Sequence, residues 1–376
     1  LMLVPLFIYK YSGFVCNGVL GMGWDTLRDL VIPIGLSFYS FQLIGFCVDT
    51  LIGGKPLPAP LDFLNFGAFF PQVVAGPIER RDDLLPQMQA PDLRLRAAVL
   101  AEGAPYIILG LFFKMALADN LAGAFWQHYE GGNALTVWAN NFLFSFRIYF
   151  DFAGYGLIAY GLAKCLGVRI TLNFLSPYTC TDASQFWRSW NISLFRWLKE
   201  YIYIPLGGNR TRFAAATLFL VFLMSGVWHG AGWNFILWGA LAGVLVLLHR
   251  AFTRFGGHLP KAVGWALTFF PMVFVWMFFY ETDMHALGGR LKLLATPGAY
   301  SPQGFLQELI DREWFGTMVV PFLGLSALVI ALEAFSKRRY GDPYKLFLSP
   351  VACGVMAYLI VLLNNTLQTP FIYFSF

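Results

Sequence analysis

Charged residues are scarce in this sequence. Lys, Arg, Asp and Glu make up 12% of its 376 residues, about half of the roughly 25% that is usual in soluble domains. The mean hydropathy is +0.60, and apolar runs of roughly 20 residues, the length that crosses a bilayer as a helix, recur along the chain. The low charge therefore excludes an ordinary soluble domain and predicts an all-α polytopic membrane protein.

Cysteine and the common catalytic motifs are lacking as well. The five cysteines are scattered and form no Cys-x-x-Cys pair, so their spacing predicts neither a disulfide framework nor a metal site. The sequence has no Gly-rich phosphate loop, no Ser-His-Asp order and no HExxH motif. The templates of soluble enzymes therefore do not apply to it.

Apolar segments divide the chain into candidate spans. Residues 62–78 form an apolar run that Pro71, Gly76 and Pro77 interrupt, so we expect a distorted or re-entrant helix there. The first nine residues are too short to span and lack the basic start of a signal peptide, so we interpret them as the end of an incomplete helix. We expect roughly ten transmembrane helices in one domain, residues 1–376. The clear spans are residues 30–51, 97–125, 135–166, 213–228, 233–248, 262–280, 316–335 and 351–363.

The basic residues indicate an orientation. The net charge is +5, but in a membrane protein Lys and Arg in loops mark the cytoplasmic side, so we expect no nucleic-acid partner. If residues 79–96 are cytoplasmic, alternation of the spans places every basic loop on that side and both His229 and the C-terminus away from it. The basic loops are residues 79–96, 169–212, 250–261 and 337–339.

Two charged residues lie inside a predicted span. Arg147 and Asp151 are four residues apart, so they can pair on one face of a helix. Charges at membrane depth face the interior of a helix bundle or a water-filled cavity, where they also mark ion pathways. The pair therefore leaves a transporter or channel open as an alternative function.

The segment FWRSWNISLFRWLKEYIYIPLGGNR, residues 186–210, is basic and rich in tryptophan. This combination predicts an amphipathic helix that lies at the membrane surface. Alternatively, its cationic face binds an anionic acyl donor such as coenzyme A. The apolar positions at helical spacing are Trp187, Trp190, Leu194, Trp197 and Leu198, and the basic positions between them are Arg188, Arg196 and Lys199.

His229 stands at the joint between two apolar segments, in GVWHGAGWNFILWG. The glycines around it allow a broken helix, and Trp228 and Trp233 can enclose a dry pocket. A neutral imidazole is suited to take a proton from a hydroxyl group near neutral pH. We therefore predict a catalytic histidine, with a structural histidine bonded to a helix carbonyl as the alternative.

Two further residues have both a structural and a chemical interpretation. Asn191 lies within the tryptophan-rich segment, where an amide side chain usually serves as a hydrogen-bonding group. Tyr373 lies in the terminal FIYFSF, which suits an aromatic belt at the membrane interface. Alternatively, the phenol of Tyr373 accepts an acyl group.

Residues 186–210 and 226–239 resemble the membrane-bound O-acyltransferase family, in particular its bacterial branch for alginate O-acetylation and teichoic-acid D-alanylation. Three further segments resemble that branch in the same order. The resemblance covers nearly the whole chain and is closer to the alginate-type acetylases. The three segments are FFPQVVAGPIERRDDLLPQM, RIYFDFAGYGLIAYGLAKCLGV and PFIYFSF.

The resemblance implies a ring of membrane helices around a thin central tunnel. His229 falls on the central histidine of the family, within a catalytic core that we place at residues 183–249. Asn191 falls on a second motif position where alginate-type members usually have histidine, and an amide can orient a substrate but cannot carry a proton. The resemblance also implies that Tyr373 carries the acyl group.

The resemblance further implies O-acetylation of an extracytoplasmic polysaccharide at the bacterial inner membrane, as in alginate biosynthesis. Acetyl-CoA would be the donor without a metal, and a periplasmic SGNH-like acetyltransferase would be the partner, with membrane lipid around the protein. The alternatives are acylation of a lysophospholipid or another lipid, D-alanyl transfer to teichoic acid, and an inactive scaffold, which Asn191 favours. The residues expected to bind the donor are Arg188, Arg196, Lys199 and Arg210.

Overall fold

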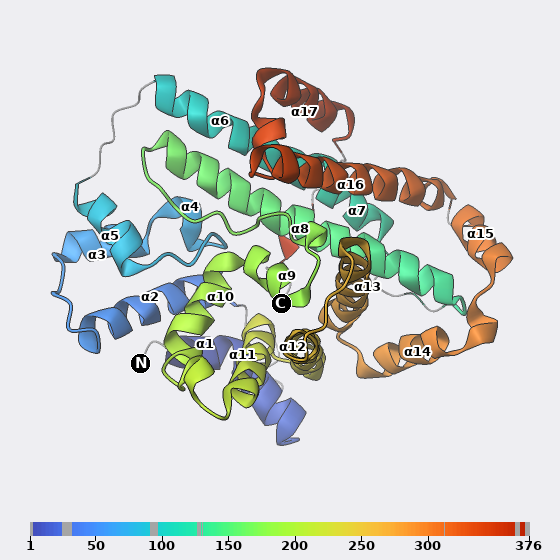
Figure 1. Ribbon diagram of the computed structural model, residues 1–376, viewed down its shortest axis with the longest axis horizontal. Coiled ribbons are helices and arrows are strands. Elements are labelled where there is room, and N and C mark those ends of the chain that lie inside the picture. The colour runs from blue at the N-terminus through green and yellow to red at the C-terminus, as the bar shows by residue number, and fades with distance from the viewer. Residues whose placement is uncertain are drawn as a thin grey trace.

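The computed structural model describes residues 3–24, 32–90, 97–125, 129, 131–311, 313–364 and 369–372. Every regular element in this part of the chain is a helix (Figure 1), which confirms the predicted all-α class. Five helical stretches within it are long and apolar enough to cross a membrane. They are Ala97–Ala124, Ala134–Cys165, Trp233–Arg254, Lys261–Tyr280 and Val319–Tyr340.

The elements follow one another in a simple order. The N-terminal half contains α1 (Leu3–Leu6), η1 (Phe7–Tyr11), η2 (Phe14–Val19), α2 (Leu36–Leu51), α3 (Pro60–Gly67), α4 (Phe70–Val73), α5 (Arg81–Gln89), α6 (Ala97–Leu111), η4 (Phe112–Ala118), α7 (Asp119–Ala124) and α8 (Ala134–Cys165). Next come η5 (Pro177–Thr179), α9 (Ala183–Ser189), α10 (Ile192–Leu198), η6 (Lys199–Tyr203), η7 (Gly208–Arg210), α11 (Ala214–His229) and α12 (Trp233–Arg254). The last elements are α13 (Lys261–Tyr280), α14 (Met284–Ala295), η8 (Pro297–Ala299), α15 (Pro302–Asp311), α16 (Glu313–Tyr340), η9 (Lys345–Leu348) and α17 (Pro350–Leu362).

Helix α8 is the centre of the fold. It begins after Asn133, whose side chain accepts a hydrogen bond from the backbone N–H of Leu135. About 78% of its most apolar stretch is buried inside the protein, against 28% for α16, so α16 is left to face lipid. In Figure 1, α8 crosses the molecule between α6 and α16 on one side and α9, α10 and α13 on the other.

Glycines bring α6 against α8. A side chain on Gly154 would place its Cβ atom 2.9 Å from the carbonyl oxygen of Gly110. One on Gly161 would place it 2.7 Å from the carbonyl oxygen of Gly103. Small residues at such a contact let helices pack closely where lipid provides no hydrophobic drive between them, and this contact seats the charged residues of η4 and α7 next to α8.

The interrupted apolar run at residues 62–78 is not one helix. It forms α3 and α4, and Pro71 lies in the first turn of α4. The predicted distortion is therefore confirmed. The non-helical residues that follow α4 lie next to the last residue of α11, because Val74 and Ala75 line a cavity together with His229.

Helices α11 and α12 form a hairpin whose contact also depends on glycine. Gly226 packs against the backbone of Phe235, and a Cβ atom on Gly239 would lie 2.5 Å from the carbonyl oxygen of Phe222. Helix α11 has only 16 residues, which span about 24 Å, less than the roughly 30 Å of a hydrocarbon core. The hairpin therefore holds the end of α11 inside the protein.

We expect Gly239→Ala to lower the melting temperature of the purified protein in detergent. The added methyl group meets backbone that cannot move aside, and such overpacking costs about 1–3 kcal/mol. Gly354→Ala in α17 is the matched control, because nothing lies within 4 Å of the position that its methyl group would take. Equal melting temperatures for the two variants would contradict the packing described here.

Candidate active site

His229 is the last residue of α11 and is 3% exposed. Three aromatic rings surround its imidazole, with centroid distances of 4.8 Å for Trp228, 4.9 Å for Trp238 and 5.1 Å for Phe279. They come from α11, α12 and α13, so the three helices together enclose the imidazole on these sides. The predicted wall residue Trp233 does not belong to this enclosure, because its side chain is 50% exposed.

A small cavity of about 60 Å³ reaches His229 from the side of α2. Its walls include Ser37 and Phe38 of α2 and the residues Val74 and Ala75 that follow α4. This volume holds more than one water molecule. The cavity therefore gives a small group access to a histidine that is otherwise enclosed.

Lys10 of η1 also lines this cavity. Its Nζ atom donates hydrogen bonds to the carbonyl oxygens of Trp228 at 2.7 Å and His229 at 2.9 Å. The last carbonyls of a helix have no partner within the helix, and a cation there also offsets the helix dipole. Lys10 thus fixes the end of α11 and, with it, the position of the imidazole.

The tryptophan-rich segment is broken at Asn191. This residue separates α9 from α10 and adopts a left-handed conformation with φ 44° and ψ 55°. Its side chain is 1% exposed, and neither its amide nitrogen nor its amide oxygen has a hydrogen-bond partner among the described residues. A buried amide without partners is costly, and the side chain of Asn191 contributes no hydrogen bond to the packing of this segment within the part of the chain that the structure describes.

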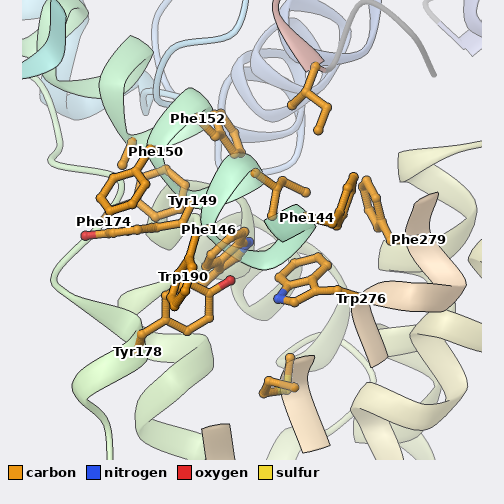
Figure 2. Packing of buried hydrophobic residues seen from close by; sticks show 14 of the residues in the cluster. Phe144, Phe146, Tyr149, Phe150, Phe152, Phe174, Tyr178, Trp190, Trp276 and Phe279 are labelled. Carbon is orange, nitrogen blue, oxygen red and sulfur yellow. The ribbon is translucent and has the colours of Figure 1, made fainter. Parts of the chain in front are cut away.

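Aromatic rings connect the break to His229. Trp190 contacts Trp276 at 4.7 Å, Trp276 contacts Phe279 at 5.5 Å, and Phe279 contacts His229 at 5.1 Å. Figure 2 shows Trp276 between Trp190 and Phe279. The second motif position and the histidine are therefore parts of one packed cluster, although they are 38 residues apart.

The structure corrects the prediction of a helix at the membrane surface. The predicted apolar face is buried inside the protein, where Trp190 is 1% exposed and Leu194 is fully enclosed. The periodicity was therefore a sign of packing against α8, α11, α12 and α13. Arg188, Arg196 and Lys199 are exposed, as the pattern predicted.

The residues after α4 hold α10 in place. The backbone N–H of Ile78 donates to the hydroxyl group of Ser193 at 2.8 Å, and Arg80 forms an ion pair with Glu200 at 2.7 Å. Glu79 accepts a hydrogen bond from the backbone N–H of Thr171. Burial raises the pKa of Glu79 to about 7. The motif FFPQVVAGPIER thus supports the segment that contains Asn191.

A larger pocket of about 500 Å³ lies at the opposite end of α11 from His229. Arg188, Lys199 and Arg250 line it together with the apolar rings of Trp187 and Phe222. This combination suits a ligand that has both phosphate groups and an apolar part. His249 also lines the pocket, and its Nε2 atom lies 3.4 Å from a carboxylate oxygen of Asp182.

The other two predicted donor-binding residues are elsewhere. Arg196 is occupied by ion pairs with Asp83 at 2.8 Å and Glu200 at 3.0 Å. Arg210 is exposed and does not line the pocket, although the preceding residue, Asn209, does. The structure therefore brings together only Arg188 and Lys199 of the predicted set.

The predicted ion pair inside α8 is replaced by another. Asp151 pairs with Lys114 of η4 at 2.8 Å, whereas the guanidinium group of Arg147 lies over the ring of Phe125. The helical spacing was correct, but α6 and η4 bring a closer cation to Asp151.

Tyr373 lies outside the described residues. Among the residues that are described, no three His, Cys, Asp or Glu side chains are grouped to hold a metal ion.

The sequence pattern of the family described as MBOAT, membrane-bound O-acyltransferase, matches residues 54–280. This match covers more than half of the chain and includes both Asn191 and His229. The chain belongs to the membrane-bound O-acyltransferase family. It is therefore an O-acyltransferase and a multi-pass membrane protein.

Several bacterial relatives are similar to this acyltransferase over most of its length. A peptidoglycan O-acetyltransferase of Helicobacter pylori is 30% identical over 98% of this chain and 79% of the relative. A probable alginate O-acetylase of Pseudomonas syringae pv. tomato is 35% identical over 90% of this chain and 67% of the relative. A probable alginate O-acetylase of Pseudomonas aeruginosa is 32% identical over 85% of this chain and 63% of the relative. The acyltransferase thus spans about two thirds of the length of the two alginate relatives.

Sequence reasoning missed three residues of the acyltransferase that the structure places in or near the site. Lys10 carries no local motif, and only the fold brings it to the end of α11. Lys114 and Asp119 are charged residues inside a predicted span. The rule that charges at membrane depth face the interior of the protein, which we applied to Asp151, applies to them as well. They were available from the sequence and were overlooked.

We expect Asn191→Gly to keep the wild-type melting temperature of the acyltransferase in detergent and Asn191→Ala to lower it. Glycine adopts the left-handed conformation freely, whereas alanine there costs about 1–2 kcal/mol. The two variants differ by one methyl group, so the comparison isolates the backbone. If alanine were tolerated as well as glycine, the left-handed break would not constrain the fold.

Proposed function

We propose that this acyltransferase passes an acetyl group from cytoplasmic acetyl-CoA across the membrane for O-acetylation of an extracytoplasmic polysaccharide. The observation that supports it most is the enclosed His229, which is reached by a small cavity at one end of α11 while a basic pocket lies at the other end. The names of the relatives support acetyl as the group transferred.

The basic pocket is the proposed binding site for acetyl-CoA. The ammonium of Lys199 and the guanidinium of Arg188 would bind its phosphate groups, because charge-assisted hydrogen bonds of this kind are strong. The rings of Trp187 and Phe222 would pack against the apolar parts of the donor. Arg196 and Arg210 do not line the pocket, so the proposal assigns them no direct contact with the donor.

His229 is the proposed general base. Its imidazole takes the proton from the acceptor hydroxyl group, which we propose to be the phenol of Tyr373. The phenol oxygen then bonds to the thioester carbonyl carbon, the carbon–sulfur bond breaks, and the thiolate of coenzyme A takes the proton from the imidazolium. The products are acetyl-tyrosine and free coenzyme A, and the histidine is restored.

The amide of Asn191 is the proposed orienting group. Its buried nitrogen and oxygen have no hydrogen-bond partner among the described residues, so both remain able to bind a donor or acceptor. The amide can donate and accept hydrogen bonds, but it does not ionise near neutral pH and therefore cannot transfer a proton. Proton transfer is therefore assigned to His229 alone.

The final acceptor is proposed to be a glycan outside the bacterial cytoplasmic membrane. Alginate and peptidoglycan, which appear in the names of the relatives, are both polysaccharides that bear hydroxyl groups. With the basic loops in the cytoplasm, Tyr373 is extracytoplasmic. A periplasmic partner of the SGNH-like class would then move the acetyl group from Tyr373 to the glycan.

We expect His229→Ala to abolish acetylation of Tyr373 in membranes supplied with acetyl-CoA. Loss of the general base removes the only proton acceptor proposed in the enclosed site. Mass spectrometry of the C-terminal peptide measures the acetyl group directly, and protein from the same preparation should keep its melting temperature. Undiminished acetylation in the folded variant would refute the proposed role of His229.

We expect the double variant Arg188→Glu and Lys199→Glu to raise the apparent KM for acetyl-CoA about tenfold or more. Two favourable contacts to phosphate groups become repulsive, and a tenfold change corresponds to about 1.4 kcal/mol. Arg338→Glu, a charge reversal on α16 that does not line the pocket, is the control. An unchanged KM in the double variant would place the donor elsewhere.

A further inference from the structure

Three charged side chains meet where η4 and α7 pack on α8. The Nζ atom of Lys114 lies 2.7 Å from a carboxylate oxygen of Asp119 and 2.8 Å from one of Asp151. Asp119 is 5% and Asp151 is 2% exposed. We call these three residues the buried charge cluster. Charged side chains at membrane depth cost free energy and persist where they have a function. The proposed mechanism assigns no role to these three residues.

The buried charge cluster binds a distant segment of the chain. Lys114 donates to the carbonyl oxygen of Thr369 at 2.9 Å, and the hydroxyl group of Thr369 donates to Asp119 at 2.6 Å. The backbone N–H of Ile372 donates to the second carboxylate oxygen of Asp151 at 2.6 Å. All three members of the cluster therefore contact residues 369–372.

The bound segment needs such partners because it is not an α-helix. Backbone groups outside regular helices are tolerated at membrane depth only where the protein satisfies them. The cluster supplies an ammonium donor for one carbonyl group and a carboxylate acceptor for one N–H group. In Figure 1 a short red segment lies beside α8 at the centre of the molecule, away from α17, and corresponds to the last described residues.

Aromatic rings place the bound segment close to the site. Phe371 packs on Tyr155 at 5.2 Å and on Phe152 at 5.8 Å, and Phe152 packs on Phe38 at 6.1 Å. Phe38 is a wall of the cavity that reaches His229. Two ring contacts therefore separate the segment from the catalytic cavity.

We propose that the buried charge cluster is a docking site that holds residues 369–372 within two ring contacts of the cavity at His229, and that acetylation of Tyr373 requires this docking. Lys114, Asp119 and Asp151 are positioning residues. The inference rests on the proposed role of Tyr373 as the acetyl acceptor.

Docking is tested directly by photo-crosslinking. The photoreactive residue p-azidophenylalanine replaces Phe371 in the full-length protein in membranes, and crosslinks to α8 are identified by mass spectrometry. We expect a crosslink near Phe152 or Tyr155, and we expect Asp151→Asn to reduce its yield at least threefold. Lys164→Met removes a charge from the last turn of α8, where Lys164 pairs with Glu102, and it should leave the crosslink unchanged.

The effect on transfer is measured with Phe371 restored. We expect Asp151→Asn to lower the rate of Tyr373 acetylation about tenfold. The apparent KM for acetyl-CoA should stay the same, because Asp151 does not line the proposed donor pocket. A smaller folded fraction would also lower the rate at unchanged KM, so the rate is expressed per folded protein, and the melting temperature of each variant is measured in the same preparation. Thr369→Val removes only the hydroxyl group of the segment and leaves the three charges intact, so it reports on docking even if Asp151→Asn does not fold.

The outcomes separate this inference from the proposed function. A crosslink that persists in both Asp151→Asn and Thr369→Val overturns the docking site. A lost crosslink with undiminished Tyr373 acetylation overturns its positioning role. If the wild type carries no acetyl group on Tyr373, and Tyr373→Phe still acetylates the glycan, the proposed acceptor is wrong, and the crosslink yields still decide whether the cluster docks the segment.

Discussion

The structure depends on one constraint, which is that backbone leaving a helix at membrane depth must find its hydrogen bonds within the protein. The chain leaves its helices at four places around the site, and each has a dedicated partner. Lys10 binds the last carbonyls of α11, and Ser193 binds the N–H group of Ile78. Asn173 accepts from the backbone at the start of α10, and Asp151 accepts from Ile372. Interrupted helices therefore meet around His229 and Asn191.

The helix that organises these breaks is α8. Its glycines admit α6 closely, its aromatic residues pack on Trp190 and Phe174, and Asp151 lies in its middle. Because one long, buried helix contacts both the break at Asn191 and the segment at residues 369–372, the two are held in one rigid frame. The short hairpin of α11 and α12 then adds His229 to this frame from the opposite side.

The sequence predicted the character of individual residues and segments, but it did not predict their partners in the folded structure. His229 between apolar runs and the interruption at Pro71 follow from the residues themselves. The apolar face of the tryptophan-rich segment was also predicted correctly. Periodicity does not show whether an apolar face packs against lipid or against protein, and here it packs against protein. Asp151 was recognised as an intramembrane charge and given the wrong partner, because the spacing within one helix says nothing about Lys114 on the next. Lys10 had no signal at all.

Lys10 and Ile372, which are 362 positions apart in the sequence, bind His229 and Asp151 respectively. During synthesis, the histidine and its enclosing helices enter the membrane well before residues 369–372 have left the ribosome. The packing around Asp151 is therefore incomplete in a nascent chain that has not yet reached residue 372. The central helix α8 enters the membrane with a buried carboxylate that receives its last hydrogen bond only when this distant segment has been made.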